Sequence, residues 1–527
     1  MTQFDDAQGS TMHHATPAAP SITDAHFSPD DARALNAAVA ARSCPRAPAM
    51  VVASFDATGV TAWHGEGDPR MDGSAVTRET VFRIASMTKS FLAATALALA
   101  EEGRLDLGAD IRTYLPSVRL CIDGEAQAVT VGELLANRSG LPEDNAWGDR
   151  QLDAEREAVA AMCAAGIALT ETPGVRYQYS NLGMSLVGRA IEAVSGKRIE
   201  AEIRDRFIDP LGLTGTRFTV DEYPHGTDIA HGFRSFDAGE TFVPEPFIGS
   251  GALACIGGLF STVDDVASWA WFLASGFADS PVRPDLLSAR SRREMQRAHT
   301  PMAAPVATGD RDCASLAYAL GLFVAEDRRF GRVADHSGGL PGFTSNMRWH
   351  VESGRGTVAF GNSDVFRADA LATAAHARVL EFSDVPSTTV LPWPECVTAA
   401  ERFDGLLRDG APLTGAADIS AANLLADFPD EARTSRFADL LAQAGGPVAQ
   451  RSFAERTIGA TDAGHLRWRI DCARGSLVCD LRMVGLTVPL VQSLQVSLAG
   501  PSGLKPEIEA PCMFDRAVLA PPRNASV

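Results

Sequence analysis

Three features of the sequence predict an α/β (α+β) fold, in which an antiparallel sheet is flanked by helices and carries an all-helical lobe. A hairpin and a long helix come first, over residues 49–102, and strand-forming segments return only after residue 316. Between them, residues 104–250 consist mainly of helices and loops. Because a sheet must bury one face against other elements, we expect the early and late strands to share one sheet. A small C-terminal α+β domain follows.

The N-terminal elements can be placed in order. Residues 1–30 are rich in Ala, Pro, Asp, Thr and Ser, which predicts a disordered tail. Residues 30–42 favour a helix. Two strands at 49–55 and 60–64 enclose Asp56-Ala57-Thr58-Gly59, which is a hairpin signal.

The next element is the helix that begins at Ser86. Strong helix formers continue to residue 102, and Gly103 follows where a C′ glycine would lie. Lys89 comes one turn after Ser86 on the same face. A serine and a lysine so spaced on an apolar helix can form an activated oxygen nucleophile, which the helix N-terminus would assist with free N–H groups. The alternative is an ordinary N-cap serine followed by a solvated lysine.

The late elements complete the predicted catalytic domain, which we place at residues 31–383. Helical periodicity covers residues 150–165 and 182–206 within the lobe. The predicted late strands are 316–324, 332–336, 345–350 and 357–361, and an Ala-rich amphipathic helix follows at 367–382. A site for a small molecule is expected in the cleft between the sheet domain and the lobe.

A linker is predicted at 384–400, because Leu391-Pro392-Trp393-Pro394 interrupts regular structure. The small α+β domain is predicted at 401–506, with a curved antiparallel sheet, and a C-terminal tail at 507–527. Within this domain we expect a helix at 434–444, a hairpin of strands 466–472 and 477–483, and a strand near 494–498.

Composition restricts the classes of partner. The 527 residues carry a net charge of −19 with a pI near 5.0, which argues against nucleic acid and anionic membrane surfaces. The nine cysteines are scattered, without the spacing of a zinc site, and no secretory signal begins the sequence. We therefore expect a cytoplasmic protein with reduced thiols, no metal and no cofactor. Its expected partner is a small-molecule or peptide substrate, and the sequence does not indicate an oligomeric state.

Two further stretches carry chemistry. Tyr179 and Asn181 lie two residues apart at the start of a predicted helix. His336 ends a predicted strand and is followed by Ser337, Gly338 and Gly339. Each residue alone would more often be structural, since half-buried tyrosines, N-cap asparagines and hydrogen-bonded histidines are common.

Together these motifs resemble the class C β-lactamase-like serine hydrolases, a family that also includes DD-peptidases, D-stereospecific aminopeptidases and esterases. The resemblance rests on Ser86-Met87-Thr88-Lys89, Tyr179-Ser180-Asn181 and His336-Ser337-Gly338, and covers about residues 40–383. It implies the β-lactamase/transpeptidase-like fold.

The resemblance also implies a role for each motif residue. Ser86 would be the nucleophile, and Lys89 or Tyr179 the general base, a choice that the sequence leaves open. Asn181 would hold Lys89 or a substrate amide. The backbone N–H groups of Ser86 and Gly339 would form the oxyanion hole.

The remaining motif residues concern the substrate. Ser337 and Gly338 would contact it, with Gly338 allowing the substrate backbone to approach closely. β-Lactamases have a lysine in place of His336, which pairs with the antibiotic carboxylate, and a mostly neutral histidine would bind that group less strongly. We therefore expect hydrolysis of a small ester or of a D-amino-acid-containing amide or peptide. The alternatives are, in order, a D-stereospecific aminopeptidase or DD-peptidase-like enzyme, a weak β-lactamase, and a catalytically silent binding protein.

Overall fold

The computed structural model describes residues 27–42, 47–303, 313–383, 385 and 390–499. The chain divides into two units, Met1–Thr388 and Thr389–Val527, which are treated separately below. The predicted tail at 507–527 and nearly all of the tail at 1–30 lie outside the described residues.

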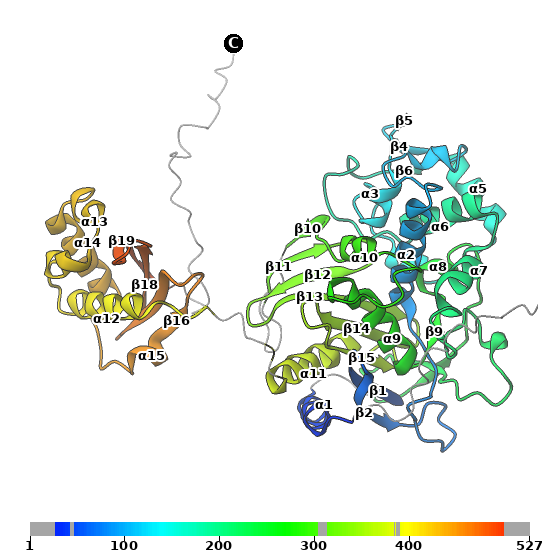
Figure 1. The fold of residues 1–527 in the computed structure, drawn as a ribbon, viewed down its shortest axis with the longest axis horizontal. Helices are drawn as coiled ribbons and strands as arrows, with labels where there is room; N and C mark the ends of the chain where they lie inside the picture. The colour runs from blue at the N-terminus through cyan, green and yellow to red at the C-terminus, as the bar shows by residue number, and fades with distance from the viewer. Residues whose placement is uncertain (1–26, 43–46, 304–312, 384, 386–389, 500–527) are drawn as a thin grey trace, which may run out of the picture. The chain divides into compact units, whose positions relative to one another are not determined.

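The first unit is built on an eight-stranded antiparallel sheet, as expected (Figure 1). β1 and β2 form the predicted hairpin, and β1 pairs with β15, so that Val51 lies opposite Phe360. Strands from the two ends of the unit thus meet in one sheet. Its order is β10 (Thr300–Met302), β11 (Cys313–Tyr318), β12 (Phe323–Asp327), β13 (Gly331–Leu340), β14 (Phe343–His350), β15 (Gly356–Gly361), β1 (Ala49–Asp56) and β2 (Gly59–Gly67).

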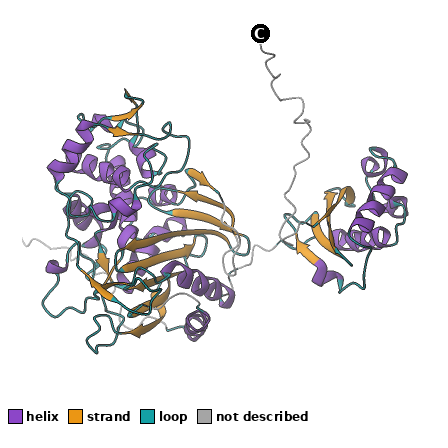
Figure 2. Ribbon diagram, turned by 180° about the vertical axis from the view of Figure 1, so that it is seen from behind, coloured by secondary structure: helices purple, strands orange, loops and turns teal. Residues whose placement is uncertain are grey.

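Helices lie on both sides of this sheet (Figure 2). The terminal helices α1 (Pro29–Ala41) and α11 (Ala368–Phe382) pack together against one face, where Leu35, Val52 and Leu371 share a core. The other face is covered by helices that include α2 (Thr88–Glu101), α9 (Val263–Ala274), η5 (Ser275–Phe277) and α10 (Ala289–Met295).

The lobe inserted between these strands is mainly helical, but the expectation that it is all-helical was wrong. Its connecting loops are close enough to pair as short strands: β4 (Leu120–Ile122), β5 (Glu125–Ala126), β6 (Ile167–Ala168), β7 (Gly232–Arg234) and β8 (Val243–Glu245). Its helical segments are η2 (Ile111–Thr113), α3 (Val131–Leu135), α4 (Asn145–Gly148), α5 (Arg156–Ala165), α6 (Asn181–Ser195), α7 (Ile199–Ile203), η3 (Arg204–Ile208) and η4 (Val220–Glu222).

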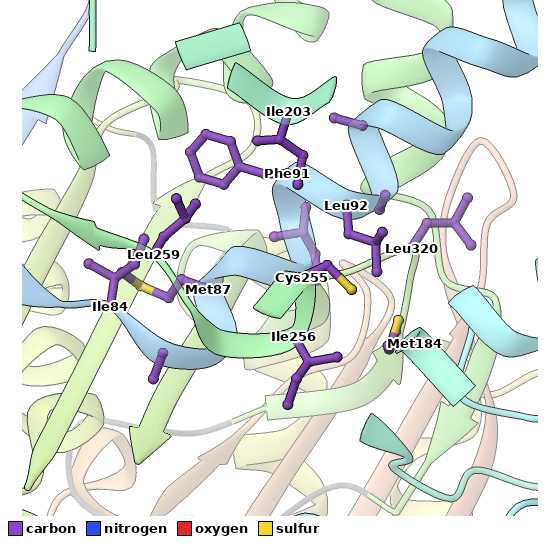
Figure 3. Close-up of a cluster of buried hydrophobic side chains, with 14 of the residues drawn as sticks. Ile84, Met87, Phe91, Leu92, Met184, Ile203, Cys255, Ile256, Leu259 and Leu320 are labelled. Carbon is purple, nitrogen blue, oxygen red and sulfur yellow. The ribbon is translucent and has the colours of Figure 1, made fainter. Parts of the chain in front are cut away.

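Helix α2 lies at the centre of the unit. A short turn, η1 (Ala85–Met87), precedes it, and Gly103 adopts a φ of +68° just after its end, as a C′ glycine does. Its residues 88–99 are all buried. Figure 3 shows the apolar cage around it, to which α6, α7 and α8 (Ala254–Gly257) contribute. Lys89, the charged residue of this buried stretch, is therefore removed from water.

One predicted strand, 316–324, is two strands in the structure. The chain turns between β11 and β12, where Gly321 has a φ of +68°. A Cβ there would lie 2.5 Å from the Lys89 carbonyl oxygen and 2.8 Å from Ala93 Cβ. The turn therefore packs directly on α2, and a continuous apolar run concealed it.

The second unit is an α+β module with an antiparallel sheet of order β16 (Thr457–Gly459), β17 (His465–Cys472), β18 (Gly475–Val484) and β19 (Leu490–Leu498). Its helices are α12 (Pro394–Arg408), η6 (Leu413–Ile419), α13 (Ala422–Ala426), α14 (Asp430–Gln443) and α15 (Phe453–Arg456). Because α12 begins at Pro394, the linker predicted at 384–400 was too long. Pro is favourable in the first turn of a helix, where its missing N–H costs nothing.

Candidate active site

Ser86 lies in the η1 turn at the entry of α2, between β3 (Phe82–Arg83) and the helix itself. The preceding Ala85 has a φ of +48°, a left-handed conformation that is strained for a residue with a Cβ. Thr88 Oγ1 holds this turn by donating to the Ala85 carbonyl at 2.7 Å. Strand β9 (Phe260–Ser261) pairs with β3 and fixes the chain just before the turn.

Lys89 is fully buried and directed at Ser86. Its Nζ donates to Ser86 Oγ at 3.0 Å and to the Ile256 carbonyl of α8 at 2.7 Å. Burial lowers the pKa of the Lys89 ammonium well below its ordinary value, and the nearby charges of Asp149 and Asp144 oppose this shift only in part. The lysine can therefore be present as the neutral amine, which accepts a proton.

Tyr179 lies next to the same pair. Its phenol interacts with the Ser86 side chain, and Lys89 Nζ lies 5.0 Å from the centre of its ring. Burial raises the pKa of the Tyr179 phenol far above its ordinary value. The phenol is thus a proton donor at neutral pH, whereas its phenolate form is strongly disfavoured.

His336 is buried, with the centre of its ring 6.4 Å from that of the Tyr179 ring. Its Nδ1 lies 2.6 Å from the Ser337 carbonyl and its Nε2 lies 3.3 Å from the Tyr318 hydroxyl. A neutral ring with its proton on Nδ1 satisfies both contacts. Burial, together with the Lys89 charge, lowers the pKa of His336 to about 3. His336 is therefore neutral at physiological pH, as expected, and both of its nitrogens already have protein partners.

The two glycines on β13 have different surroundings. A Cβ on Gly338 would lie 2.3 Å from the Ile84 carbonyl and 2.2 Å from Ser345 Oγ, whereas a Cβ on Gly339 would meet no atom within 4 Å. Gly338 thus permits β13 to approach the turn that carries Ser86, which corrects the expectation that it gives room to substrate. Gly339, the next residue of β13, borders open space, as an oxyanion-hole residue would. Ser337 Oγ accepts from Asn346 Nδ2 at 2.9 Å.

Asn181 does not hydrogen-bond Lys89, so that part of the prediction was wrong. Its Nδ2 donates to Asn145 Oδ1 at 3.1 Å, because α4 packs on the start of α6. Its Oδ1 is buried with no hydrogen-bond partner among the described residues. This oxygen is a free acceptor, which is the property that binding of a substrate amide N–H requires.

Three residues that hold the site were missed from the sequence. Asp144 accepts from Ser180 Oγ and from the N–H groups of Asn181 and Leu182, and so caps α6. Asn137, with a φ of +50°, accepts from the Ser180 N–H at 3.0 Å. Tyr318 supports His336. The motifs described in the sequence analysis do not include these three residues, and no local pattern marks them.

Other kinds of site find less support in the described part of the chain. It contains no group of three or more His, Cys, Asp or Glu residues that could hold a metal ion. Its helices include none with the length and apolar character needed to cross a bilayer. A groove of about 650 Å³, lined by Arg290, Arg293 and Arg332 among others, contains none of the residues predicted to act in catalysis.

In a comparison with known protein families, residues 36–381 match the Beta-lactamase family model. Protein flp of Staphylococcus aureus strain COL is 26% identical over 287 residues, which are 54% of this chain and 53% of flp. Penicillin-binding protein 4 of Amycolatopsis lactamdurans is 30% identical over 148 residues, 27% of this chain and 38% of that protein. The chain thus matches about half or less of the length of these curated relatives.

Solved structures show the same fold at low identity. The octameric penicillin-binding protein homologue from Pyrococcus abyssi has a TM-score of 0.55 and 18% identity, covering 88% of this chain and 97% of that chain. D-Amino acid amidase from Ochrobactrum anthropi SV3 has a TM-score of 0.52 and 23% identity, covering 67% and 97%. Because 88% of the 527 residues is more than the 388 residues of the first unit, the likeness to the Pyrococcus abyssi structure extends into the second unit.

Proposed function

Since this chain belongs to the beta-lactamase family, whose members are serine hydrolases, we propose that it hydrolyses an ester or amide bond through an acyl-enzyme on Ser86. The observation that carries this proposal is the contact of 3.0 Å between Lys89 Nζ and Ser86 Oγ. A hydroxyl becomes an effective nucleophile only when a base with a suitable pKa lies within hydrogen-bond reach. A buried lysine with a lowered pKa is such a base.

The geometry supports a division of roles between the two candidate bases. Ser86 Oγ attacks the carbonyl carbon while its proton passes to neutral Lys89. The N–H groups of Ser86 and Gly339 receive the oxyanion. Tyr179, whose phenol stays protonated, gives its proton to the leaving amine or alkoxide and regains one from Lys89. Water then attacks the acyl-enzyme by the same route in reverse and releases the acid.

The substrate that we propose is a small ester or a D-amino-acid-containing amide or peptide. His336 is neutral and already bonded to Tyr318 and Ser337, so it provides no permanent cation for the carboxylate of a β-lactam. We therefore rank weak β-lactamase activity below hydrolysis of these esters, amides or peptides. We propose no nucleic-acid or membrane partner, because the net charge is −19. The cytoplasmic location also remains a proposal, and the free thiols of the described cysteines support it.

An amidase or D-stereospecific aminopeptidase is the second candidate. The unpartnered Oδ1 of Asn181 favours it, because a buried acceptor gains most from a substrate N–H, which an ester lacks. A substrate amide would supply that N–H next to its carbonyl.

The test compares the purified protein with its Ser86→Ala variant. The substrates are p-nitrophenyl acetate, D- and L-aminoacyl p-nitroanilides and nitrocefin, and a fluorophosphonate probe is followed by mass spectrometry of the Ser86 peptide. Ser185→Ala is the matched control, because Ser185 is a buried helical serine that donates only to Leu182. We expect turnover and labelling in the wild type and the control, and neither in Ser86→Ala. Full turnover by folded Ser86→Ala would refute the proposal, and no labelling of the folded wild type would favour a catalytically silent binding protein.

A further inference from the structure

A groove of about 650 Å³ lies between α10 on one side and the strands β11, β12 and β13 on the other (Figure 1). Sites that bind small molecules have volumes of about 300–1,000 Å³, so the groove has a suitable size. Its lining contains none of the residues predicted to act in catalysis. The groove is therefore a candidate for a second site, with a ligand of its own.

The helix side of the groove is mainly basic. Arg290, Arg293 and Glu294 are three and four residues apart, so they lie on one face of α10. Arg297 lines the groove just beyond the end of the helix, 3.7 Å from Glu294. Arg293 Nη1 donates to the Gly276 carbonyl at 2.6 Å, which holds that side chain in place. The three arginines of this side thus border the same space.

The opposite side is one face of the sheet. Ser315, Glu326 and Arg332 lie directly opposite one another on three neighbouring strands. Ala317 and Val324 form the next pair along on the same face, because side chains two residues apart on a strand project to the same side. Ala317 and Val324 are buried, whereas Ser315 and Glu326 are exposed. The sheet thus gives the groove an apolar part next to a charged row.

Positive charge exceeds negative charge in this groove, although the whole chain is acidic. Four arginines and two glutamates line it, which leaves an excess of two positive charges, whereas the chain carries a net charge of −19. Arg290 and Arg332 come from opposite sides of the groove. Neither forms an ion pair or a side-chain hydrogen bond with the residues that the structure describes. Their guanidinium N–H groups are therefore available to a ligand.

The charge and the lining together indicate the class of ligand. Guanidinium groups offer paired N–H donors whose geometry matches the oxygens of a phosphate group. A phosphate monoester carries a charge of about −1.5 to −2 at pH 7, which balances the excess in the groove, whereas a carboxylate would balance only half of it. Phe277, which is half-buried, and the buried Ala317 and Val324 provide apolar contacts for an organic group.

We propose that this groove binds a small organic phosphate. The phosphate group is bound by the arginines of the two sides, and the organic group packs against Phe277, Ala317 and Val324. The ligand is bound without any covalent step. This inference does not depend on the proposed hydrolysis, because the groove contains neither Ser86 nor Lys89.

The test is isothermal titration calorimetry of the full chain with phenyl phosphate, compared with inorganic phosphate and benzoate. We expect saturable binding of phenyl phosphate with a Kd below about 1 mM, and weaker binding of the other two. Arg290→Gln and Arg332→Gln should each raise this Kd about tenfold, because each removes charged hydrogen-bond donors. Glu326→Gln should lower it about threefold, because it removes a negative charge next to Arg332.

Arg198→Gln is the matched control, because Arg198 is an exposed arginine directly before α7 and does not line the groove. It should leave the Kd unchanged. If Arg332→Gln does not fold, Arg290→Gln provides the same measurement, since the Arg290 side chain is exposed.

Three outcomes would overturn the inference. The first is no saturable binding of phenyl phosphate by the folded protein. The second is a Kd that stays the same in Arg290→Gln and Arg332→Gln, or that rises in Glu326→Gln. The third is equal affinity for inorganic phosphate and phenyl phosphate, which would indicate an adventitious ion only. Loss of Ser86-dependent turnover would refute the proposed function and leave this inference standing.

Discussion

The close approach of β13 to the Ser86 turn yields a quantitative prediction for Gly338→Ala. The new Cβ would lie 2.3 Å from the Ile84 carbonyl oxygen, 2.2 Å from Ser345 Oγ and 3.0 Å from Ala85 Cβ. Ordinary contact begins at 3.4 Å, so the strand must retreat from the turn by about 1 Å. The Ser345 hydroxyl cannot simply rotate away at no cost, because it donates to the same Ile84 carbonyl at 2.7 Å.

The expected cost has two parts. Overpacking of this kind lowers the free energy of unfolding by about 1–3 kcal/mol. A displacement of about 1 Å between the Ser86 and Gly339 N–H groups should lower kcat/KM by about 100-fold. Thermal unfolding and hydrolysis of p-nitrophenyl acetate measure the two effects separately.

Gly339→Ala is the comparison for stability, since its Cβ would meet no atom within 4 Å. It should keep the wild-type Tm. If Gly338→Ala matched the wild type in both Tm and kcat/KM, the argument that this glycine sets the spacing of the oxyanion hole would be wrong.

Three further predictions follow from buried titratable groups. Lys89→Met should lower kcat/KM by about 10²–10⁴-fold, and Lys89→Arg should not restore it, because a guanidinium does not lose its proton. A kcat/KM equal to that of the wild type in either variant would contradict this prediction. Burial lowers the pKa of His336 from 6.5 to about 3, so the unfolded chain binds a proton that the folded chain excludes, and stability falls as the pH drops through that window. Urea titrations at pH 7 and pH 5 give the slope of the unfolding free energy against pH, which in His336→Asn should be smaller than in the wild type by up to about 1.4 kcal/mol per pH unit. An unchanged slope would contradict a neutral His336. Asp404→Ala should destabilise the second unit by about 3–5 kcal/mol, because the buried Arg456 guanidinium, which donates to the Asp404 carboxylate at 2.7 and 2.8 Å, would lose its counter-charge. Chemical unfolding of the full chain, followed by tryptophan fluorescence, tests this prediction, and an unchanged midpoint would contradict it.

Much of the fold was predictable because its signals are local. The β1–β2 hairpin, α2 and α11 were each indicated by a turn sequence, a helix stop or a continuous helical pattern within one segment. The turn at Gly321 and the start of α12 at Pro394 were not, since neither changes the hydrophobic pattern around it. In the first case the deciding contact is with α2, more than 200 residues earlier in the chain.

The sequence by itself determined the residue types of the site. Ser86 and Lys89 are one helical turn apart, so their contact follows from helix geometry alone. Only the tertiary structure decided the environment of those groups. The pKa of Lys89 depends on a cage drawn from three other helices, His336 is neutral because it is buried against Tyr318, and Asn181 contacts Asn145 instead of Lys89. The ionisation state and the hydrogen-bond partners of a side chain depend on which distant segments pack around it and exclude water. The local sequence does not indicate which segments these are.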